Sequence, residues 1–125
     1  MKSSRRGRFA EDRCGEWPAI VAGSTRFAAV YRELRVYTVR PGAMDTWVAE
    51  WLEHICPLRR SLGFSIPAAW VVEGADRFVW LLEYSGADYE AANQLYYDSP
   101  ERQAVDPEPT RHLMNTEHWR LRSVL

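Results

Sequence analysis

Hydrophobic positions change from a strand pattern to a helical pattern within residues 31–63. Residues 31–39 are rich in β-branched and aromatic side chains and precede Pro41 and Gly42, which predicts a strand and a tight turn. After the turn, hydrophobic residues recur at steps of three and four, so they form one stripe on a helix. Gly63 is placed to end this helix, which we expect to pack back on its own sheet. The stripe consists of Met44, Trp47, Val48, Trp51, Leu52, Ile55, Leu58 and Leu62.

Three further segments have the composition of strands. Residues 65–73 have an apolar middle, and Pro67 removes one backbone donor, so we expect an edge strand here. Residues 77–84 contain an unbroken apolar run, which predicts a central strand with both faces buried. Residues 117–125 alternate between two sets of side chains and predict a final strand.

A second helix completes the order of the elements. Residues 89–97 predict a helix with Asp88 as its N-cap, and Pro100 suits the first position of a further turn. The order strand, helix, strand, strand, helix, strand is that of ferredoxin-like α+β proteins. We therefore predict a four-stranded antiparallel sheet with two helices on one face and with its first and third strands in the middle. Residues 1–30 show no sustained period, which predicts a flexible N-terminal tail before a domain at 31–125.

Apolar residues occupy both faces of the predicted central strands, yet two helices cover only one face of such a sheet. On the first strand, Tyr37 and Val39 alternate with Leu34 and Val36. The second face needs its own cover, and a second copy of the same sheet would provide it. This predicts a homodimer joined sheet to sheet. The alternative is that the polar first 30 residues fold over that face.

Composition narrows the range of partners. A net charge of -1 over 125 residues argues against nonspecific binding to nucleic acid or to an acidic membrane surface. No apolar run approaches the ~20 residues that span a bilayer. Cys14 and Cys56 lie in different settings, which favours a reducing, cytoplasmic location over a disulfide framework. The chain has no glycine-rich phosphate loop, GxSxG elbow, zinc cluster or calcium loop, so we expect neither a metal nor a cofactor.

Several motifs resemble those of one known family. Residues 31–42, YRELRVYTVRPG, resemble the opening of NIPSNAP-family domains, which typically reads YELRxYTLKPG, and residues 57–63, PLRRSLG, resemble the family's PLRRKHG. Trp70 stands at the aromatic position of the family's second strand, and residues 98–104 resemble its DPEWQAY segment. The resemblance covers residues 31–125. It implies the dimeric α/β-barrel superfamily, in which two ferredoxin-like sheets face each other with helices outside.

The third strand departs from the family's pattern. Members commonly carry HLWxY there, whereas residues 80–84 read WLLEY, so Trp80 stands where histidine is frequent. A polar function of that histidine is therefore not carried over. The family's PEW is also Pro-Glu-Arg at residues 100–102. The wider superfamily includes cofactor-free monooxygenases, haem-degrading enzymes, isomerases and ligand binders, so the resemblance supports a fold better than any one activity.

Three polar residues are candidates for chemistry. Arg59 falls between Val48 and Leu52 on the apolar arc of the first helix, where it either lines a polar pocket or reaches the free carbonyls and solvent at the helix end. His54 lies at the opposite margin of the stripe and is either a proton acceptor or a boundary residue. His112 can approach the same site from another element.

Aromatic side chains on the strands and the first helix are candidates for a ligand pocket between helices and sheet, with core and dimer packing as the alternative. They are Tyr37, Trp47, Trp51, Trp70, Trp80 and Tyr84. The leading hypothesis is a small dimeric protein that binds a hydrophobic or aromatic small molecule. One alternative is a cofactor-free oxygenase or isomerase, with His54 or His112 moving a proton and Arg59 stabilising an anion. Another is a non-catalytic interaction protein.

Overall fold

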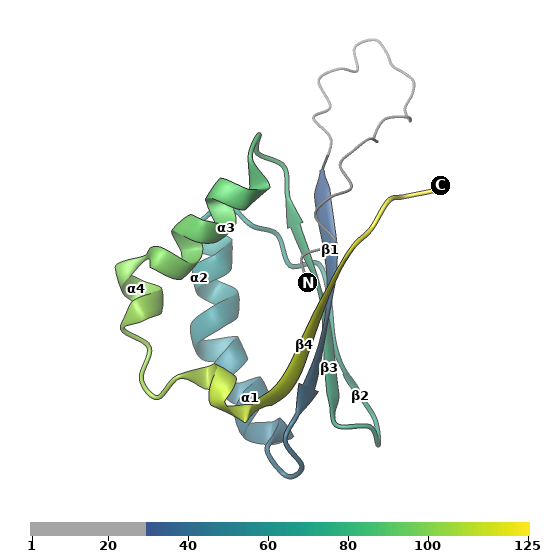
Figure 1. Cartoon of the computed structure of the whole chain (residues 1–125), viewed down its shortest axis with the longest axis vertical. Helices are drawn as coiled ribbons and strands as arrows, with labels where there is room; N and C mark the ends of the chain where they lie inside the picture. Colours follow the sequence, from purple (N-terminus) through teal and green to yellow (C-terminus); the bar gives the residue numbers. More distant parts are fainter. Residues whose placement is uncertain (1–29) are drawn as a thin grey trace.

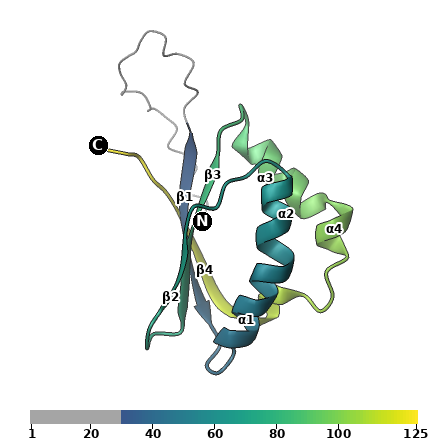
Figure 2. The same cartoon turned by 180° about the vertical axis from the view of Figure 1, so that it is seen from behind.

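A four-stranded antiparallel sheet carries a layer of helices on one face (Figures 1 and 2). The computed structural model describes residues 30–125, so the predicted tail lies almost entirely outside the described residues. The strands lie in the order β2-β3-β1-β4, with the first and third in the middle as predicted. The predicted ferredoxin-like α+β fold is confirmed. The strands are β1 (Tyr31–Val39), β2 (Ala69–Val72), β3 (Arg77–Tyr84) and β4 (Leu113–Arg120).

The helical layer consists of two longer segments and two short turns. Its elements are α1 (Met44–Glu50), the π-helical turn η4 (Trp51–Ile55), α2 (Cys56–Ser61), α3 (Tyr89–Asp98), α4 (Pro100–Gln103) and the 3-10 turn η5 (Pro109–His112). The first three are continuous and form the predicted first helix. Gly63 follows this helix with a φ of 97°, a left-handed conformation that suits glycine. Asp88 caps α3 as predicted, because its Oδ1 accepts a hydrogen bond of 3.0 Å from the N–H of Ala91.

The π-helical turn η4 lies just before Pro57, which has no N–H to donate to the carbonyl of Glu53. In this turn the N–H of Cys56 donates to the carbonyl of Trp51, five residues earlier. A π turn holds about one residue more than an α turn, so it rotates the rest of the helix by roughly 100°. The rotation carries Arg59 from the margin of the predicted stripe to its middle, where its side chain is 1% exposed.

Two members of the predicted stripe are not buried. Leu52 is 57% exposed and Leu62 is 40% exposed. Leu52 stands within the π turn at the margin of the stripe, and Leu62 follows the turn and is rotated away from the sheet. A wheel with 3.6 residues per turn therefore describes the helix correctly only before η4.

Aromatic side chains of the first helix and of β3 make the core beside this turn. Trp47 and Trp51 pack edge-on against Phe78, with ring centroids 5.8 Å and 5.0 Å apart. Trp51 also lies edge-on to Trp80 at 5.4 Å. All four side chains are buried, so aromatic burial makes a large share of the hydrophobic stabilisation in this region.

Two strands differ in length from the prediction. The second is shorter than residues 65–73, because Pro67 interrupts the pairing and only an isolated bridge joins Ser65 to Glu83 before β2. The predicted final strand, 117–125, begins and ends too late. β4 pairs with β1, and the N–H of Leu121 donates to Arg32 near the start of β1, so the residues beyond it have little strand left to pair with.

The sheet face opposite the helices is apolar and partly exposed. In the register of the sheet, Trp70 lies opposite Val79, and Leu34 lies opposite Trp119. The two tryptophans at the outer strands are 52% and 55% exposed. The unbroken run of β3 predicted a central strand with both faces buried; β3 is central, but Val79 and Leu81 on this face are only partly buried. Within residues 30–125, no helix has the length and apolar character needed to cross a membrane.

Candidate functional site

A pocket of about 520 Å³ opens beside β4, on the side of the sheet that carries the helices. Its lining mixes apolar and hydrogen-bonding side chains from β1, α3, η5 and β4. Thr116 and His118 belong to this face because they lie opposite Tyr37 and Arg35 in the register of β4 and β1. The lining residues are Tyr37, Tyr97, Thr110, Leu113, Met114, Asn115, Thr116 and His118.

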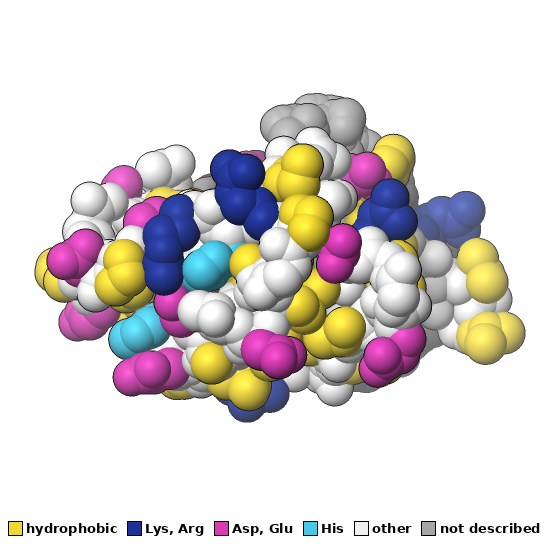
Figure 3. Space-filling model, turned by 90° about the horizontal axis from the view of Figure 1, so that it is seen from below, with side chains coloured by type: hydrophobic (Ala, Val, Ile, Leu, Met, Phe, Trp, Pro, Cys, Tyr) yellow, Lys and Arg dark blue, Asp and Glu magenta, His cyan; other side chains and the backbone are white. Residues whose placement is uncertain are grey.

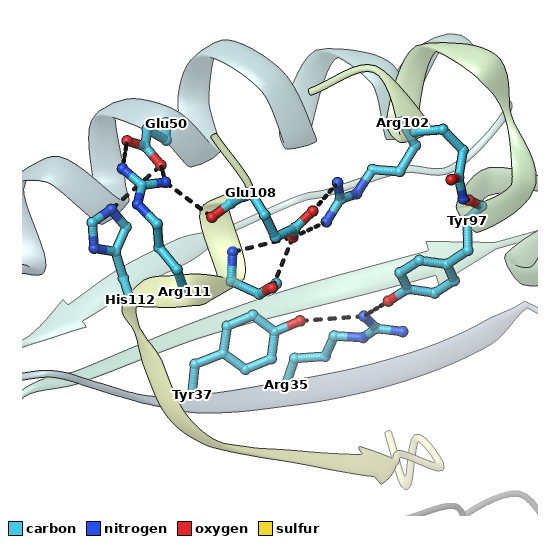
Figure 4. A network of polar contacts seen from close by, with 10 residues as sticks. Arg35, Tyr37, Glu50, Tyr97, Arg102, Glu108, Arg111 and His112 are labelled. Carbon is cyan, nitrogen blue, oxygen red and sulfur yellow. Dashed lines mark hydrogen bonds and ion pairs between the residues drawn. The ribbon is translucent and has the colours of Figure 1, made fainter. Parts of the chain in front are cut away.

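Arg35 lies behind two of these lining residues and joins them (Figure 4). Its Nη1 donates to the phenol oxygens of Tyr37 and Tyr97, each at 3.3 Å. Its Nη2 donates to the hydroxyl of Tyr89 at 3.0 Å, and its Nε donates to Glu33 at 2.7 Å. The guanidinium is 1% exposed and is held in place by all of these partners, so its charge has a fixed position behind the pocket.

Glu33 is the buried counter-ion of Arg35. Its carboxylate also accepts hydrogen bonds from the hydroxyls of Tyr31 at 3.0 Å and Tyr89 at 3.2 Å. Burial opposes the charge, but Arg35 and these hydrogen bonds outweigh it and lower the pKa of Glu33. The two residues therefore form an ionised pair within the protein.

Arg59 is a second buried cation close to the first, and it has no such counter-ion within the described part of the chain. Its Nη1 donates to the amide oxygen of Asn93 at 2.9 Å, and its guanidinium lies 3.8 Å from the ring centroid of Tyr96. Its Nε has no hydrogen-bond partner, and no carboxylate among residues 30–125 forms an ion pair with it. Burial and the positive charge of Arg35 lower the pKa of Arg59. Such an environment favours the approach of a negative charge.

The buried cluster of Glu33, Arg35 and Arg59 thus contains two cations and one anion. Its excess positive charge acts on Tyr97, whose ring is 5.2 Å from the Arg59 guanidinium. Burial opposes ionisation of the phenol, but Arg35 and Arg59 outweigh it and lower the pKa of Tyr97. For Tyr37 burial is stronger and raises the pKa. An oxygen that bears negative charge is therefore favoured on the Tyr97 side of the pocket.

Ion pairs hold the segment between α4 and β4 at the rim of the pocket (Figure 4). Arg102 donates to both carboxylate oxygens of Glu108, at 2.9 Å and 2.6 Å. The same carboxylate accepts a bond of 2.7 Å from the hydroxyl of Thr110, a lining residue. The hydrogen bonds from Arg102 are the main reason that the pKa of Glu108 falls to about 2. This pair stays charged at neutral pH and fixes the position of Thr110.

A second ion-pair group lies at the end of the molecule near α1. Arg111 donates to both carboxylate oxygens of Glu50, at 3.0 Å and 2.8 Å, and His112 lies 3.4 Å from the same carboxylate. Figure 3 views the molecule from this end and shows histidine, basic and acidic side chains beside one another. These contacts tie η5 to the first helix, so they serve to orient the start of β4.

The predicted polar candidates lie in three different places. Arg59 belongs to the buried cluster behind the pocket. His54 is partly exposed on η4, with its Nε2 3.7 Å from the carboxylate of Glu53 on the same helix. His112 belongs to the ion-pair group around Glu50. Neither histidine is among the residues that line the pocket.

Of the predicted aromatic lining residues, Tyr37 lines the pocket. Trp47, Trp51 and Trp80 are buried in the core, where Trp47 and Trp51 pack on Phe78 and Trp51 packs on Trp80. Trp70 lies on the opposite face of the sheet, and Tyr84 packs against Phe64 at 5.1 Å.

Sequence reasoning did not select Arg35, Tyr97 or His118. A signal for Arg35 was present, because alternation along β1 places residues 33 and 35 on the same face as Tyr37 and Val39. A charged pair on an inward face is a functional signal, since an isolated buried charge is costly. Tyr97 and His118 carried no such signal, because only the tertiary structure brings α3 and β4 to the same pocket. Among the described residues, no group of three His, Cys, Asp or Glu side chains is placed to hold a metal ion.

The fold is that of ferredoxin-like α+β proteins. Among known structures, it is similar to those of NIPSNAP-family proteins. No family model and no curated protein matches the sequence. An uncharacterised NIPSNAP domain protein from Burkholderia xenovorans has a similar structure, with a TM-score of 0.66 and 16% identity over 74% of this chain and 93% of that one. A NIPSNAP-family protein of unknown function from Agrobacterium tumefaciens gives a TM-score of 0.67 and 13% identity, over 75% and 87% of the two chains.

A crystal structure described as an antibiotic biosynthesis monooxygenase is also similar, with a TM-score of 0.58 and 14% identity over 76% of this chain and 99% of that one. At these identities the similarity is one of fold. The family that the sequence motifs resemble is thus confirmed as a structural match, and the function has to be argued from this chain's own site.

Proposed function

We propose that this protein binds a small organic molecule with an apolar or aromatic body in the pocket beside β4. The pocket itself is the observation that supports this most directly. Its volume of about 520 Å³ lies within the usual range for small-molecule sites. Leu113, Met114 and the ring of Tyr37 supply apolar surface, while hydroxyl, amide and imidazole groups supply orientation. Such a mixture is typical of sites that bury a ligand's body and fix its polar end.

Filling the pocket tests this proposal. The environment-sensitive dye 1-anilinonaphthalene-8-sulfonate serves as the probe, and its fluorescence is titrated with the full-length protein. In the variant Thr116→Trp an indole occupies the pocket, so we expect the dissociation constant of the dye to rise by at least about 10-fold. Leu95→Trp is the matched control, because Leu95 is an exposed residue of α3 that does not line the pocket. Equal binding by both variants would contradict the proposal.

The protein is also proposed to act as a homodimer joined through the sheet face that carries no helices. Val79 and Leu81 of the central strand β3 lie partly buried on that face, flanked by the exposed Trp70 and Trp119. The charged residues Arg32 and Glu83 of this face neutralise each other across a 2.6 Å contact. An apolar and nearly neutral sheet face can pair with its own copy under two-fold symmetry, so a second copy of the chain is the occupant we propose.

Native mass spectrometry of the purified full-length chain tests the dimer and any retained ligand together. The expected result is a dimer mass, which Val79→Glu converts to a monomer because a carboxylate would be buried at the interface. Leu95→Glu, on the helical side, should leave the dimer intact. A monomeric mass for the unchanged chain would overturn this assignment without affecting the pocket.

A further inference from the structure

Four tyrosines surround the ion pair of Arg35 and Glu33, and they use their hydroxyl protons differently. Tyr31 and Tyr89 donate their protons to the carboxylate of Glu33. Tyr37 and Tyr97 accept hydrogen bonds from Nη1 of Arg35, and within residues 30–125 neither of their protons is donated to a protein acceptor. These two are also the tyrosines that line the pocket. Two phenol protons are therefore available to a bound ligand.

The shared contact with Arg35 places both phenol oxygens beside one cation. Each accepts a hydrogen bond of 3.3 Å from the same nitrogen, and Figure 4 shows the two hydroxyls on either side of it. A phenol whose oxygen accepts a bond from a cation is polarised and becomes a stronger donor. The guanidinium is fixed by Glu33 and Tyr89, so the donors are oriented before any ligand arrives.

The charge of the surroundings favours the same type of ligand. Arg59 adds a second buried positive charge that no carboxylate among the described residues neutralises. An anionic oxygen in the pocket would bring the cluster of two cations and one anion to neutrality. A neutral ligand would leave the excess positive charge in a low-dielectric site.

We infer that Tyr37 and Tyr97, backed by Arg35, form an oxyanion-binding site that takes the deprotonated oxygen of a phenol or of an enolised carbonyl compound. The two hydroxyls donate to that oxygen, and the ligand's apolar body lies against Leu113 and Met114. The proton that the ligand loses passes to solvent, and no bond to carbon is made or broken. This inference rests on the proposed pocket and specifies the chemical class of its ligand.

The probe for this site is 4-nitrophenol, because its phenolate absorbs at a longer wavelength than the neutral phenol. Absorbance is titrated against pH with and without the full-length protein. A site of this kind should lower the apparent pKa of the bound probe and bind the phenolate at least about 10-fold more tightly than the phenol. Binding with no spectral shift, or no binding at all, would overturn the inference.

Three phenylalanine variants separate the proposed donors from their neighbour. Tyr97→Phe and Tyr37→Phe should each reduce the preference for the phenolate by roughly 10-fold, since each removes a hydrogen bond to a charged oxygen. Tyr89→Phe is the matched control, because Tyr89 also contacts Arg35 but does not line the pocket. An equal loss in Tyr89→Phe would assign the effect to the Arg35 network instead.

The inference and the proposed function fail in different ways. If the dye binds and Thr116→Trp blocks it while 4-nitrophenol shows no phenolate preference, the pocket stands and its ligand is not an oxyanion. If Thr116→Trp changes the binding of neither probe, both conclusions fail together.

Discussion

The helix-facing side of the sheet has two regions that use burial in opposite ways. Around Trp47, Trp51, Phe78 and Trp80, rings pack edge-on, and the indole N–H groups have no hydrogen-bond partner in the described part of the chain. In the second region, Glu33 and Arg35 of β1 are also buried, but nearly all of their polar atoms form hydrogen bonds.

The inward residues of β1 thus change from charged to apolar along a single strand. The aromatic region is closed and contributes stability through the area it buries. The charged region costs desolvation and lies beside the pocket that Tyr37 and Tyr97 line. The first region stabilises the fold, and the second is the region to which our proposal assigns ligand binding.

The largest expected effect falls on the aromatic region. Trp47→Ala removes a fully buried side chain and leaves a cavity, so it should lower the free energy of unfolding by about 3–5 kcal/mol. Urea unfolding followed by circular dichroism measures this loss. Leu95→Ala on the exposed side of α3 is the control and should change the free energy by less than about 1 kcal/mol. Similar losses in both variants would remove the distinction between core and surface.

Arg35→Met should cost about 3 kcal/mol, because it leaves Glu33 buried without its cation. Burial then raises the pKa of Glu33 above its unfolded value, so the added cost is absent below the unfolded pKa and appears as the pH rises toward the raised folded pKa. Urea unfolding at pH 5 and pH 8 tests the sign of this dependence. The double variant Glu33→Leu with Arg35→Leu should recover part of the loss, and a deficit that does not depend on pH would contradict the role of Glu33.

Arg59→Met should cost about 1 kcal/mol or less, although Arg59 is as deeply buried as Arg35. It leaves no unpaired carboxylate behind, and methionine can fill much of the volume between α2 and the rings of Tyr96 and Phe64. Removing this cation should also raise the pKa of Tyr97, which Arg59 helps to lower. Ultraviolet titration of tyrosine ionisation measures that change, and Arg60→Met is the exposed control. A loss equal to that of Arg35→Met would erase the proposed difference between the two arginines.

The smallest expected effect concerns the rim. The pKa of Glu108 is lowered to about 2, so the contribution of its pair with Arg102 is complete above pH 4.5 and is lost as the pH falls toward 2. In Glu108→Gln the free energy of unfolding should therefore decrease less steeply as the pH falls over that range. Because Glu108 is half exposed, the change at neutral pH is expected to be small. Acid unfolding curves of the two variants Glu108→Gln and Glu101→Gln measure this effect. Glu101 is the control, because it forms no ion pair in residues 30–125. Identical curves would show that the pair of Arg102 and Glu108 does not contribute to stability.

Local pattern was sufficient to determine the elements, their order and most of their contacts with the core. Hydrophobic residues at steps of three and four identified the first helix. Alternation identified β1, and the unbroken apolar run at Phe78–Leu82 identified the central β3. These features depend on neighbours along the chain, so the sequence determines them. The motifs at residues 31–42 and 57–63 also indicated the family whose known structures this fold matches.

Tertiary structure decided the site. The π turn before Pro57 rotated the end of the first helix, which exposes Leu62 and buries Arg59 fully, and a helical wheel with a constant period cannot represent an added residue. The pocket brings together Tyr37 of β1, Tyr97 of α3 and His118 of β4, which are far apart in the chain. Whether a tyrosine donates to Glu33 or faces a pocket depends on where these elements meet. The sequence determines which side chains are present. The distances between them are set only when the sheet and the helices pack together.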